Sequence, residues 1–512
     1  MSATVPHPAP APDTGSGTAD RWRWIALAVV MTASFMDLVD VTIVNIAVPS
    51  IQRDLGASFS AIQWVTGGYS LAFAIGLITG GRLGDIYGRK RIFLIGIIGF
   101  TLASALCGLA GSPDLLVATR ILQGGAAALM VPQVLAIVHV TFPAEERGKV
   151  FGLFGAMMGL GAVSGPMLGA LLTEWNLFGL EWRPIFLINL PIGIAGLLLG
   201  LRYVTESKAP QSLRLDLVGM ALAALGLLML LYPLTEGRES GWPLWGFVSM
   251  ACSPLVLALF VRYERIKTRR DGSPLVELSL FKVRSFAAGV GVQLTFGVVT
   301  GIFFLAWTLY MQLGLGWSPL RAGATGIPFS IAISGAAGVS VQQLVPRFGR
   351  KVLQAGALVM AAGALLYLAE ANRYGAGIHP WQMVPPLLVM GAGMGLIVAP
   401  LTDAVLTDVP PEHSGSASGV INTTQQLGNA LGLGLASVAF FSVVDRIDPA
   451  HSTAAAIFTD AFTHALWWVV AALLTVFLLM LALPLRARPH SEEDSGAEDA
   501  AGDPVDESAA VG

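Results

Sequence analysis

The sequence predicts an all-α integral membrane protein with fourteen transmembrane helices, arranged as two six-helix bundles and two inserted linker helices. Three observations predict this fold class: the composition, a series of long apolar segments and an internal repeat. Of the 512 residues, 54% are hydrophobic and only 12% are charged, about half the charged fraction of a typical soluble domain. The mean hydropathy is +0.69. These values exclude a water-soluble globular protein.

Charge and cysteine content exclude further classes. The net charge of -3 argues against a nucleic-acid partner. Cys107 and Cys252 each lie within an apolar segment and provide neither a disulfide framework nor metal-ligand spacing. We therefore expect no metal and no cofactor. We also expect a monomer.

Fourteen segments have the roughly 20 apolar residues that a helix needs to cross a bilayer. They lie at 24–48, 60–80, 92–110, 114–137, 150–172, 184–202, 216–235, 244–262, 286–312, 319–342, 352–369, 381–404, 416–441 and 463–484. The segments are too long for the strands of a membrane β-barrel, so helices must satisfy the backbone in lipid. The 59 glycines suit closely packed membrane helices.

The distribution of basic residues predicts the orientation. With the N-terminus in the cytoplasm, most Lys and Arg residues fall in cytoplasmic segments, as the positive-inside rule requires. Arg120 lies within a span. The exceptions in or near outer loops are Arg53, Arg183, Arg238, Arg321, Arg373 and Arg446. An even number of spans returns the C-terminus to the cytoplasm, so we expect both termini there.

An internal repeat defines the domains. Tyr87–Lys90 resembles Phe348–Lys351 at an offset of 261 residues, and Pro143–Gly152 resembles Pro410–Gly419 at an offset of 267. Two parallel six-helix units predict a transporter with a central site and alternating access. The expected domains are a disordered tail at 1–20, a first bundle at 21–205, two inserted helices at 206–265, a second bundle at 266–486 and an acidic disordered tail at 487–512.

Five motifs carry a family resemblance. Gly81–Arg91 resembles the signature loop between helices 2 and 3 of the major facilitator superfamily. Asp40–Pro49, Arg120–Gly125, the glycines of 155–169 and Trp182–Pro191 resemble motifs of its fourteen-spanning drug:proton antiporters, which include multidrug and antibiotic resistance exporters. The resemblance covers about residues 24 to 485 and implies the fold of that superfamily and proton-coupled export.

Buried charges form the candidate proton-coupling site. At 1.5 Å per residue, Arg120 lies about 9 Å below the outer surface. Asp37 and Asp40 lie about 10 and 6 Å below it, on one face of helix 1. Ionisable groups inside a membrane normally face a cavity and have a partner. Asp37 is an addition to the family motif.

Two interpretations of these charges remain open, a proton switch or a structural ion pair. The switch is favoured for Asp40, and the two are balanced for Asp37. Asp403 joins the candidate proton-coupling residues, although its expected position near the cytoplasmic end of its helix favours an ordinary interfacial carboxylate.

The candidate gating residues fall in two motifs. Gly81, Asp85, Gly88 and Arg89 would form a cytoplasmic latch that holds the outward-open state, because Asp85 can pair with Arg89 or cap a neighbouring helix. The alternative is a basic anchor that only sets topology. Gly161, Gly165 and Pro166 of helix 5 would form a tight seal or simply pack.

The candidate substrate-binding residues are chosen by chemistry alone. Aromatic, methionine and amide side chains suit cationic or planar apolar ligands. They are Trp64, Tyr69, Gln123, Met158, Phe303, Trp307, Asn422 and Gln425.

The sequence therefore predicts a proton-coupled exporter of drugs or amphipathic small molecules, some of them cationic, in the inner membrane of a bacterium. Its partners would be these substrates and membrane lipids, with protons as the coupling ion. Export or flipping of a lipid or an endogenous metabolite is the main alternative, since the inserted helices could line a lateral entry. Proton-coupled uptake, an integral-membrane enzyme and a sensor are less favoured, because helix 5 carries the antiporter motif and no catalytic motif is present.

Overall fold

The computed structural model describes residues 16–57, 59–175, 179–208, 216–237, 240–272, 274–406, 408–410, 413–444 and 453–483. The regular structure in these ranges is helical throughout, without a strand. The first group of helices comprises α1 (Ser16–Leu55), α2 (Phe59–Tyr87), α3 (Arg89–Gly108), α4 (Pro113–Thr141), α5 (Ala144–Glu174), α6 (Pro184–Leu187) and α7 (Asn189–Tyr203). The inserted helices are α8 (Leu217–Glu236) and α9 (Leu244–Asp271).

The second group follows a short 3-10 turn, η2 (Leu278–Lys282). It comprises α10 (Arg284–Leu309), η3 (Tyr310–Gly314), α11 (Pro319–Ala324), α12 (Ile327–Val339), η4 (Ser340–Leu344), α13 (Val345–Phe348), α14 (Lys351–Tyr374), η5 (Gly375–Gly377), α15 (Pro380–Leu406), α16 (Ser414–Val444) and α17 (Ala454–Met480).

The all-helical membrane fold is confirmed. Eleven stretches of helix in the described residues are long and apolar enough to cross a membrane. Each of the fourteen segments expected from the sequence coincides with a helix or a helix pair, but fourteen crossings stay a prediction. The expected tails lie largely outside the described residues. The first bundle begins earlier than expected, because α1 starts at Ser16 and not at residue 21. The inserted helix α9 ends at Asp271, beyond the expected boundary at 265.

Two expected spans are interrupted where a proline removes a backbone donor. Pro191 cannot donate to the carbonyl of Leu187, and α6 ends at Leu187. Pro328 cannot donate to the carbonyl of Ala324, and α11 ends there. The continuous helix expected at 184–202 is therefore split into α6 and α7. The helix expected at 319–342 is split into α11 and α12, and α12 continues directly into η4.

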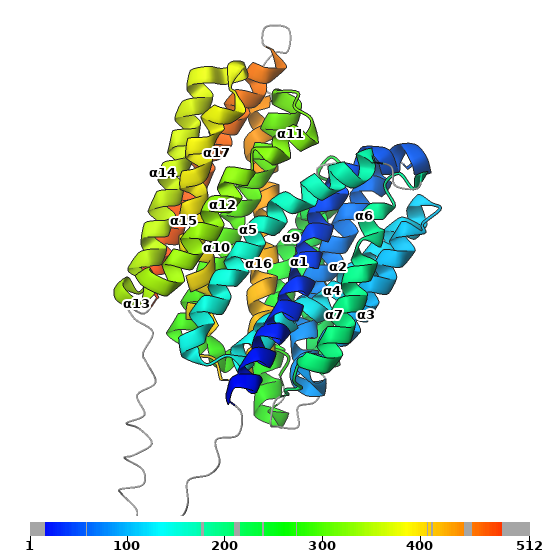
Figure 1. The fold of residues 1–512 in the computed structure, drawn as a ribbon, viewed down its shortest axis with the longest axis vertical. Helices are drawn as coiled ribbons and strands as arrows, with labels where there is room; N and C mark the ends of the chain where they lie inside the picture. Colours follow the sequence, from blue (N-terminus) through cyan, green and yellow to red (C-terminus); the bar gives the residue numbers. More distant parts are fainter. Residues whose placement is uncertain are drawn as a thin grey trace, which may run out of the picture.

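The two groups of helices lie beside each other, with α5 and α16 between them (Figure 1). The groups meet where α2 packs on α16 and where α5 packs on α12. The inserted helix α8 packs on α9, α2 and α16, so it covers the contact between the groups. We call the end at which α2 ends and α3 begins the base, and the opposite end, which carries α6 and α11, the top (Figure 1).

The internal repeat is visible in the backbone. Gly88 and Gly349 both adopt a positive φ, at 107° and 54°, in the turns that lead into α3 and α14. Side chains other than glycine rarely adopt this conformation. The second repeated motif has equivalent contacts, because Gly152 of α5 faces Gly338 of α12 while Gly419 of α16 faces the backbone of α2 at Leu77. The contacts between the groups therefore follow the repeat.

Candidate functional site

The intramembrane charges meet where α1 contacts α4. Arg120 Nη1 of α4 donates to Asp40 Oδ2 of α1 at 2.5 Å. Asp40 has no exposed surface, and Arg120 is 1% exposed. A charged hydrogen bond of this kind is about twice as strong as a neutral one, so it links the two helices tightly.

Two amide side chains complete the hydrogen bonding of Asp40. Gln123 Nε2 and Asn189 Nδ2 donate to Asp40 Oδ1 at 3.0 and 2.9 Å. Asn189 also donates to Ser104 Oγ at 3.0 Å, and Gln123 Oε1 accepts from Arg120 Nη1 at 2.7 Å. Both Asp40 oxygens are therefore occupied, by donors from α4 and α7.

Asn189 was not among the residues predicted for the site. It lies within the motif Trp182–Pro191 and is buried. An amide side chain in an otherwise apolar segment could have indicated this position from the sequence.

The guanidinium of Arg120 has contacts beyond Asp40. Arg120 Nε donates to the backbone oxygen of Val65 at 3.0 Å. The guanidinium carbon lies 4.2 Å from the ring centre of Tyr69, a cation–π distance. Tyr69 of α2 therefore contacts the charge pair through the face of its ring.

Asp37 occupies a different environment from Asp40. Its Oδ1 accepts a hydrogen bond from the Tyr69 hydroxyl. Asp37 is half-buried, whereas Asp40 is fully buried. Tyr69 thus joins the two carboxylates: its hydroxyl donates to Asp37, and its ring stacks beneath the arginine that pairs with Asp40.

A cavity of about 420 Å³ lies against this cluster. Its walls come from α1, α2, α4, α8 and α16, so both groups of helices and one inserted helix contribute. The lining residues are Val41, Thr66, Gly67, Tyr69, Ser70, Leu71, Ala74, Arg120, Leu231, Gln426, Asn429, Ala430 and Leu433. The wall mixes apolar side chains with neutral polar ones, and it contains no carboxylate.

The cavity lies on the top side of the contact between α2 and α16. The wall uses residues 66–74 of α2 and 426–433 of α16. Nearer the base the two helices touch, because a Cβ added at Gly81 would lie 2.2 Å from the backbone oxygen of Gly415. The protein is therefore closed below the cavity at this contact.

Of the predicted substrate-binding residues, Tyr69 lines this cavity. Gln123 belongs to the hydrogen bonds of Asp40 instead. Phe303 and Trp307 are buried and stack at 5.6 Å, and Trp307 donates to Tyr367 at 2.9 Å. Trp64 packs against Tyr232 of α8. The roles of these residues remain predictions.

The amides predicted on α16 neighbour those in the cavity wall. Asn422 bonds within its own helix, to the oxygen of Ser418 at 2.9 Å. Gln425 is half-buried. Gln426 and Asn429, which the sequence analysis did not select, line the cavity. The side chain of Met158 lies outside the described residues.

Asp403 of α15 is half-buried and interacts electrostatically with Arg147 of α5. Arg147 in turn donates to the backbone oxygens of Phe142 and His139 at 3.0 and 2.9 Å. The two charges come from different groups of helices and are separate from Asp40 and Arg120. The part of Asp403 in proton coupling remains a prediction.

The predicted latch residues join α2 to α16 at the base. Asp85 Oδ1 accepts from Arg89 Nη2 at 2.8 Å and from the Gly415 backbone N–H at 3.1 Å, while Oδ2 accepts from the Ser416 N–H at 2.8 Å. Asp85 therefore both pairs with Arg89 and caps α16, as the sequence suggested. We call Asp85, Arg89, Gly415 and Ser416 the basal contact.

A second carboxylate supports this turn and was not predicted. Glu206 Oε1 and Oε2 accept from the backbone N–H groups of Lys90 and Arg91 at 3.1 and 3.3 Å. A Cβ at Gly88 would lie 2.5 Å from the Glu206 carboxylate. Gly88 is therefore needed both for its positive φ and for this close approach.

The glycines of α5 have two sets of partners. A Cβ added at Gly165 would lie 1.8 Å from Thr42 Oγ1, and one at Gly161 would lie 2.5 Å from Leu38, both on α1. Nearer the base, Gly148 faces Val341 of η4, in the second group of helices. Gly161 and Gly165 of the helix 5 motif therefore pack on α1. The side chain of Pro166, the third predicted residue of this motif, lies outside the described residues.

Comparison with known proteins agrees with this architecture. The family model for the major facilitator superfamily matches residues 30–433. The chain is 45% identical over 419 residues to the probable actinorhodin transporter of Streptomyces coelicolor, which covers 82% of this chain and 72% of that protein. It is 34% identical over 480 residues to the puromycin resistance protein pur8 of Streptomyces alboniger, covering 92% and 93%.

A solved structure agrees at the level of the fold. The human organic anion transporter MFSD10 (TETRAN) matches with a TM-score of 0.62 at 17% sequence identity, over 90% of this chain and 99% of that one. The helices, the repeat and the matched family model lead to one conclusion. The chain belongs to the major facilitator superfamily and is a multi-pass membrane transporter, not an enzyme.

Proposed function

We propose that this transporter exports drugs or other amphipathic small molecules across a bacterial cytoplasmic membrane in exchange for protons. The observation that carries this proposal is that Tyr69 and Arg120 line the cavity between the two groups of helices while contacting Asp37 and Asp40. One cluster can therefore respond both to a bound substrate and to a proton. The relatives named as an actinorhodin transporter and a puromycin resistance protein support drug export.

The base of the molecule is the cytoplasmic side in this proposal. Arg89, Lys90 and Arg91 follow α2, and Arg350 and Lys351 lie at the equivalent position, where α14 begins. Basic residues concentrate on the cytoplasmic side of membrane proteins. With fourteen crossings, both termini are cytoplasmic.

The structure then corresponds to a state closed toward the cytoplasm. The basal contact holds α2 against α16, and the cavity lies on the outer side of it. Alternating access requires this contact to break while the outer ends of the helices approach. Charge-assisted hydrogen bonds contribute about 1.5–3 kcal/mol each, so the basal contact would favour the outward-facing state.

Asp37 is the better candidate for the titrating group. Asp40 already has an arginine and two amide donors and is sealed from solvent, so a proton would have to displace a buried ion pair. Asp37 is only half-buried and has one hydrogen bond, from Tyr69. This geometry favours Asp37, which the sequence analysis had ranked below Asp40.

Protonation of Asp37 would act through Tyr69. A proton added to Asp37 neutralises the acceptor of the Tyr69 hydroxyl and weakens a charge-assisted hydrogen bond. Tyr69 can then move relative to the cavity and to Arg120. The proton leaves Asp37 when the site faces the other side of the membrane.

The proton gradient provides enough free energy for export. One charge moving through 100 mV supplies about 2.3 kcal/mol, and one pH unit adds about 1.4 kcal/mol. These amounts together support a concentration ratio of several hundredfold per proton.

Inside-out membrane vesicles test the proposal directly. With the vesicle interior acidified, addition of a transported amphipathic compound should release protons in exchange, recorded with a pH-sensitive dye. A vesicle set that carries Arg120→Ala should show no substrate-evoked release. Proton movement that is equal in both sets, or absent with every compound that the protein demonstrably transports, would contradict proton-coupled export.

Export or flipping of a lipid is the second candidate, and one observation favours it. Leu231 of the inserted helix α8 lines the cavity, so a ligand in the cavity contacts a helix that covers the contact between the groups. Transport of labelled lipid, without transport of soluble drugs, would favour this alternative.

A further inference from the structure

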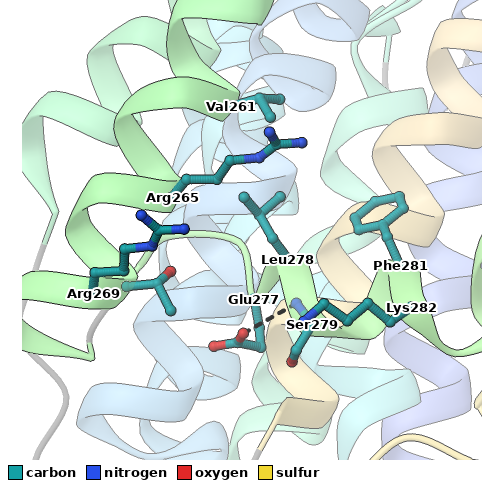
Figure 2. A pocket seen from close by; sticks show the side chains of 9 residues that line it. Val261, Arg265, Arg269, Glu277, Leu278, Ser279, Phe281 and Lys282 are labelled. Carbon is teal, nitrogen blue, oxygen red and sulfur yellow. Dashed lines mark hydrogen bonds between the residues drawn. The ribbon is translucent and has the colours of Figure 1, made fainter.

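A second pocket, of about 640 Å³, lies at the basal end of α9 and is separate from the transport cavity. Figure 2 shows Arg265 and Arg269 on the side of α9 and Phe281 and Lys282 on the opposite side. The pocket is thus formed between the end of an inserted helix and the η2 turn before the second group of helices. Nothing in the transport cycle described above uses it.

Three cations line this pocket without an ion-pair partner among the described residues: Arg265, Arg269 and Lys282. All three side chains are exposed. The one carboxylate in the wall, Glu277, accepts a hydrogen bond from the Ser279 backbone N–H at 3.2 Å (Figure 2). The pocket therefore has an excess of positive charge and suits an anion.

The positions along α9 explain why the two arginines point to one place. Val261, Arg265 and Arg269 are spaced by four residues, so they share one face of the helix. Counted from Leu244 at 1.5 Å per residue, Arg265 lies about 32 Å and Arg269 about 38 Å along α9. The hydrocarbon core is about 30 Å thick, which places both guanidinium groups at the level of lipid headgroups.

Three apolar side chains and two hydroxyl side chains, Thr268 and Ser279, complete the wall. Leu278 and Phe281 face the pocket together with Val261. Only 17% of the apolar span of α9 is buried inside the protein, so the helix presents most of its surface to lipid. Leu255 and Leu259, 69% and 52% exposed, belong to this lipid-facing surface of the helix. An acyl chain could therefore lie along α9 while its headgroup occupies the pocket.

We propose that this pocket binds the phosphate group of an anionic phospholipid, with Arg265, Arg269 and Lys282 as its ligands. Basic pockets between membrane helices on the cytoplasmic side bind such headgroups. This lipid site rests on the membrane position of α9 and on the cytoplasmic orientation of the base proposed above. It does not depend on which substrate is exported.

Native mass spectrometry of the full chain in detergent tests the proposal. The protein is titrated with phosphatidylglycerol or with phosphatidylcholine of the same acyl chains, and bound lipid is counted. Phosphatidylglycerol should bind more tightly. About 1 kcal/mol per basic residue near a membrane surface corresponds to about fivefold in affinity, so R265Q/R269Q should weaken phosphatidylglycerol binding by about 25-fold.

A matched variant controls for general charge. R262Q/R270Q removes the same charge from the same end of α9 at exposed positions outside the pocket, and it should leave binding nearly unchanged. K282Q changes the opposite wall of the pocket and should weaken binding about fivefold. This single variant tests the site independently of the folding of R265Q/R269Q.

Three outcomes would overturn the lipid site. The first is equal affinity for the two lipids. The second is equal loss in both double variants, which would indicate only the general potential of the surface. The third is displacement of the lipid by inorganic phosphate at a matched concentration, which would indicate a site for a small anion. Loss of drug transport without loss of lipid binding would bear on the proposed function alone.

Discussion

At the scale of single residues, the two carboxylates of α1 differ more than their spacing suggests. Asp40 and Asp37 are three residues apart, yet their surroundings differ. Asp40 is enclosed by Arg120, Gln123 and Asn189, whereas Asp37 is half-buried and accepts a hydrogen bond from Tyr69. One position therefore suits a structural role and the other suits reversible protonation. Substitutions of the two residues should therefore differ in their effect on stability.

Asp40→Asn should destabilise the protein by about 3–5 kcal/mol, because it leaves Arg120 buried without its counterion. Asp37→Asn should cost about 1 kcal/mol, the typical net value of one hydrogen bond. Unfolding of the purified variants in detergent, followed by circular dichroism, measures both. Equal destabilisation, or a larger effect at Asp37, would contradict the assignment of Asp40 as the structural partner.

Tyr69→Phe should uncouple transport from pH while keeping the cavity. The variant retains the ring beneath Arg120 and removes the hydroxyl that donates to Asp37. Substrate affinity should change less than about threefold, whereas the acceleration of export by an imposed pH gradient should fall at least about tenfold, the effect of roughly 1.4 kcal/mol.

The matched control is Tyr232→Phe, on α8, whose ring contacts Trp64 and Trp245. This variant should behave like the wild type. An unchanged pH response in Tyr69→Phe would remove Tyr69 from the coupling.

At the scale of helices, close contacts between the two groups depend on glycine. Gly81 allows α2 to touch the backbone of α16 beside the basal contact. A clash with a backbone oxygen cannot be relieved by rotating a side chain. A methyl group at position 81 would therefore force α2 and α16 apart.

Gly81→Ala should push the base apart and favour the inward-facing state. Spin labels at Tyr87 and Phe348, both exposed at the base, report this by double electron–electron resonance in a background with Cys107 and Cys252 replaced. The mean distance should increase. Gly125→Ala serves as control, because a Cβ there meets nothing within 4 Å; the same increase in both variants would contradict a local cause.

The sequence predicted the helices and the charge cluster because both depend on local rules. Apolar length placed the spans, and the depth of Arg120 relative to Asp37 and Asp40 followed from the rise per residue. The rotation of each helix about its axis is set by packing, so the sequence could not decide which carboxylate bonds Arg120. For the same reason it selected Asn422 and Gln425 on α16, whereas Gln426 and Asn429 line the cavity.

In the whole molecule, the two groups of helices meet through two pseudo-equivalent contacts beside the transport cavity. The contacts of α2 with α16 and of α5 with α12 come from repeated motifs, but only the first carries the carboxylate Asp85. The equivalent position in the second half is Pro346. The ion pair of Asp85 with Arg89 therefore has no equivalent in the second half, and α8 packs on the two helices, α2 and α16, that it joins.

Coupling of export to a proton on Asp37 is tested best by two assays on the same proteoliposomes. One measures accumulation of an amphipathic substrate driven by an imposed pH gradient, and the other measures exchange of labelled for unlabelled substrate without a gradient. In Asp37→Asn, accumulation should be lost while exchange persists, because exchange needs no net proton transfer. Arg120→Ala should lose both. Accumulation that persists in Asp37→Asn at the wild-type rate would contradict proton coupling through Asp37.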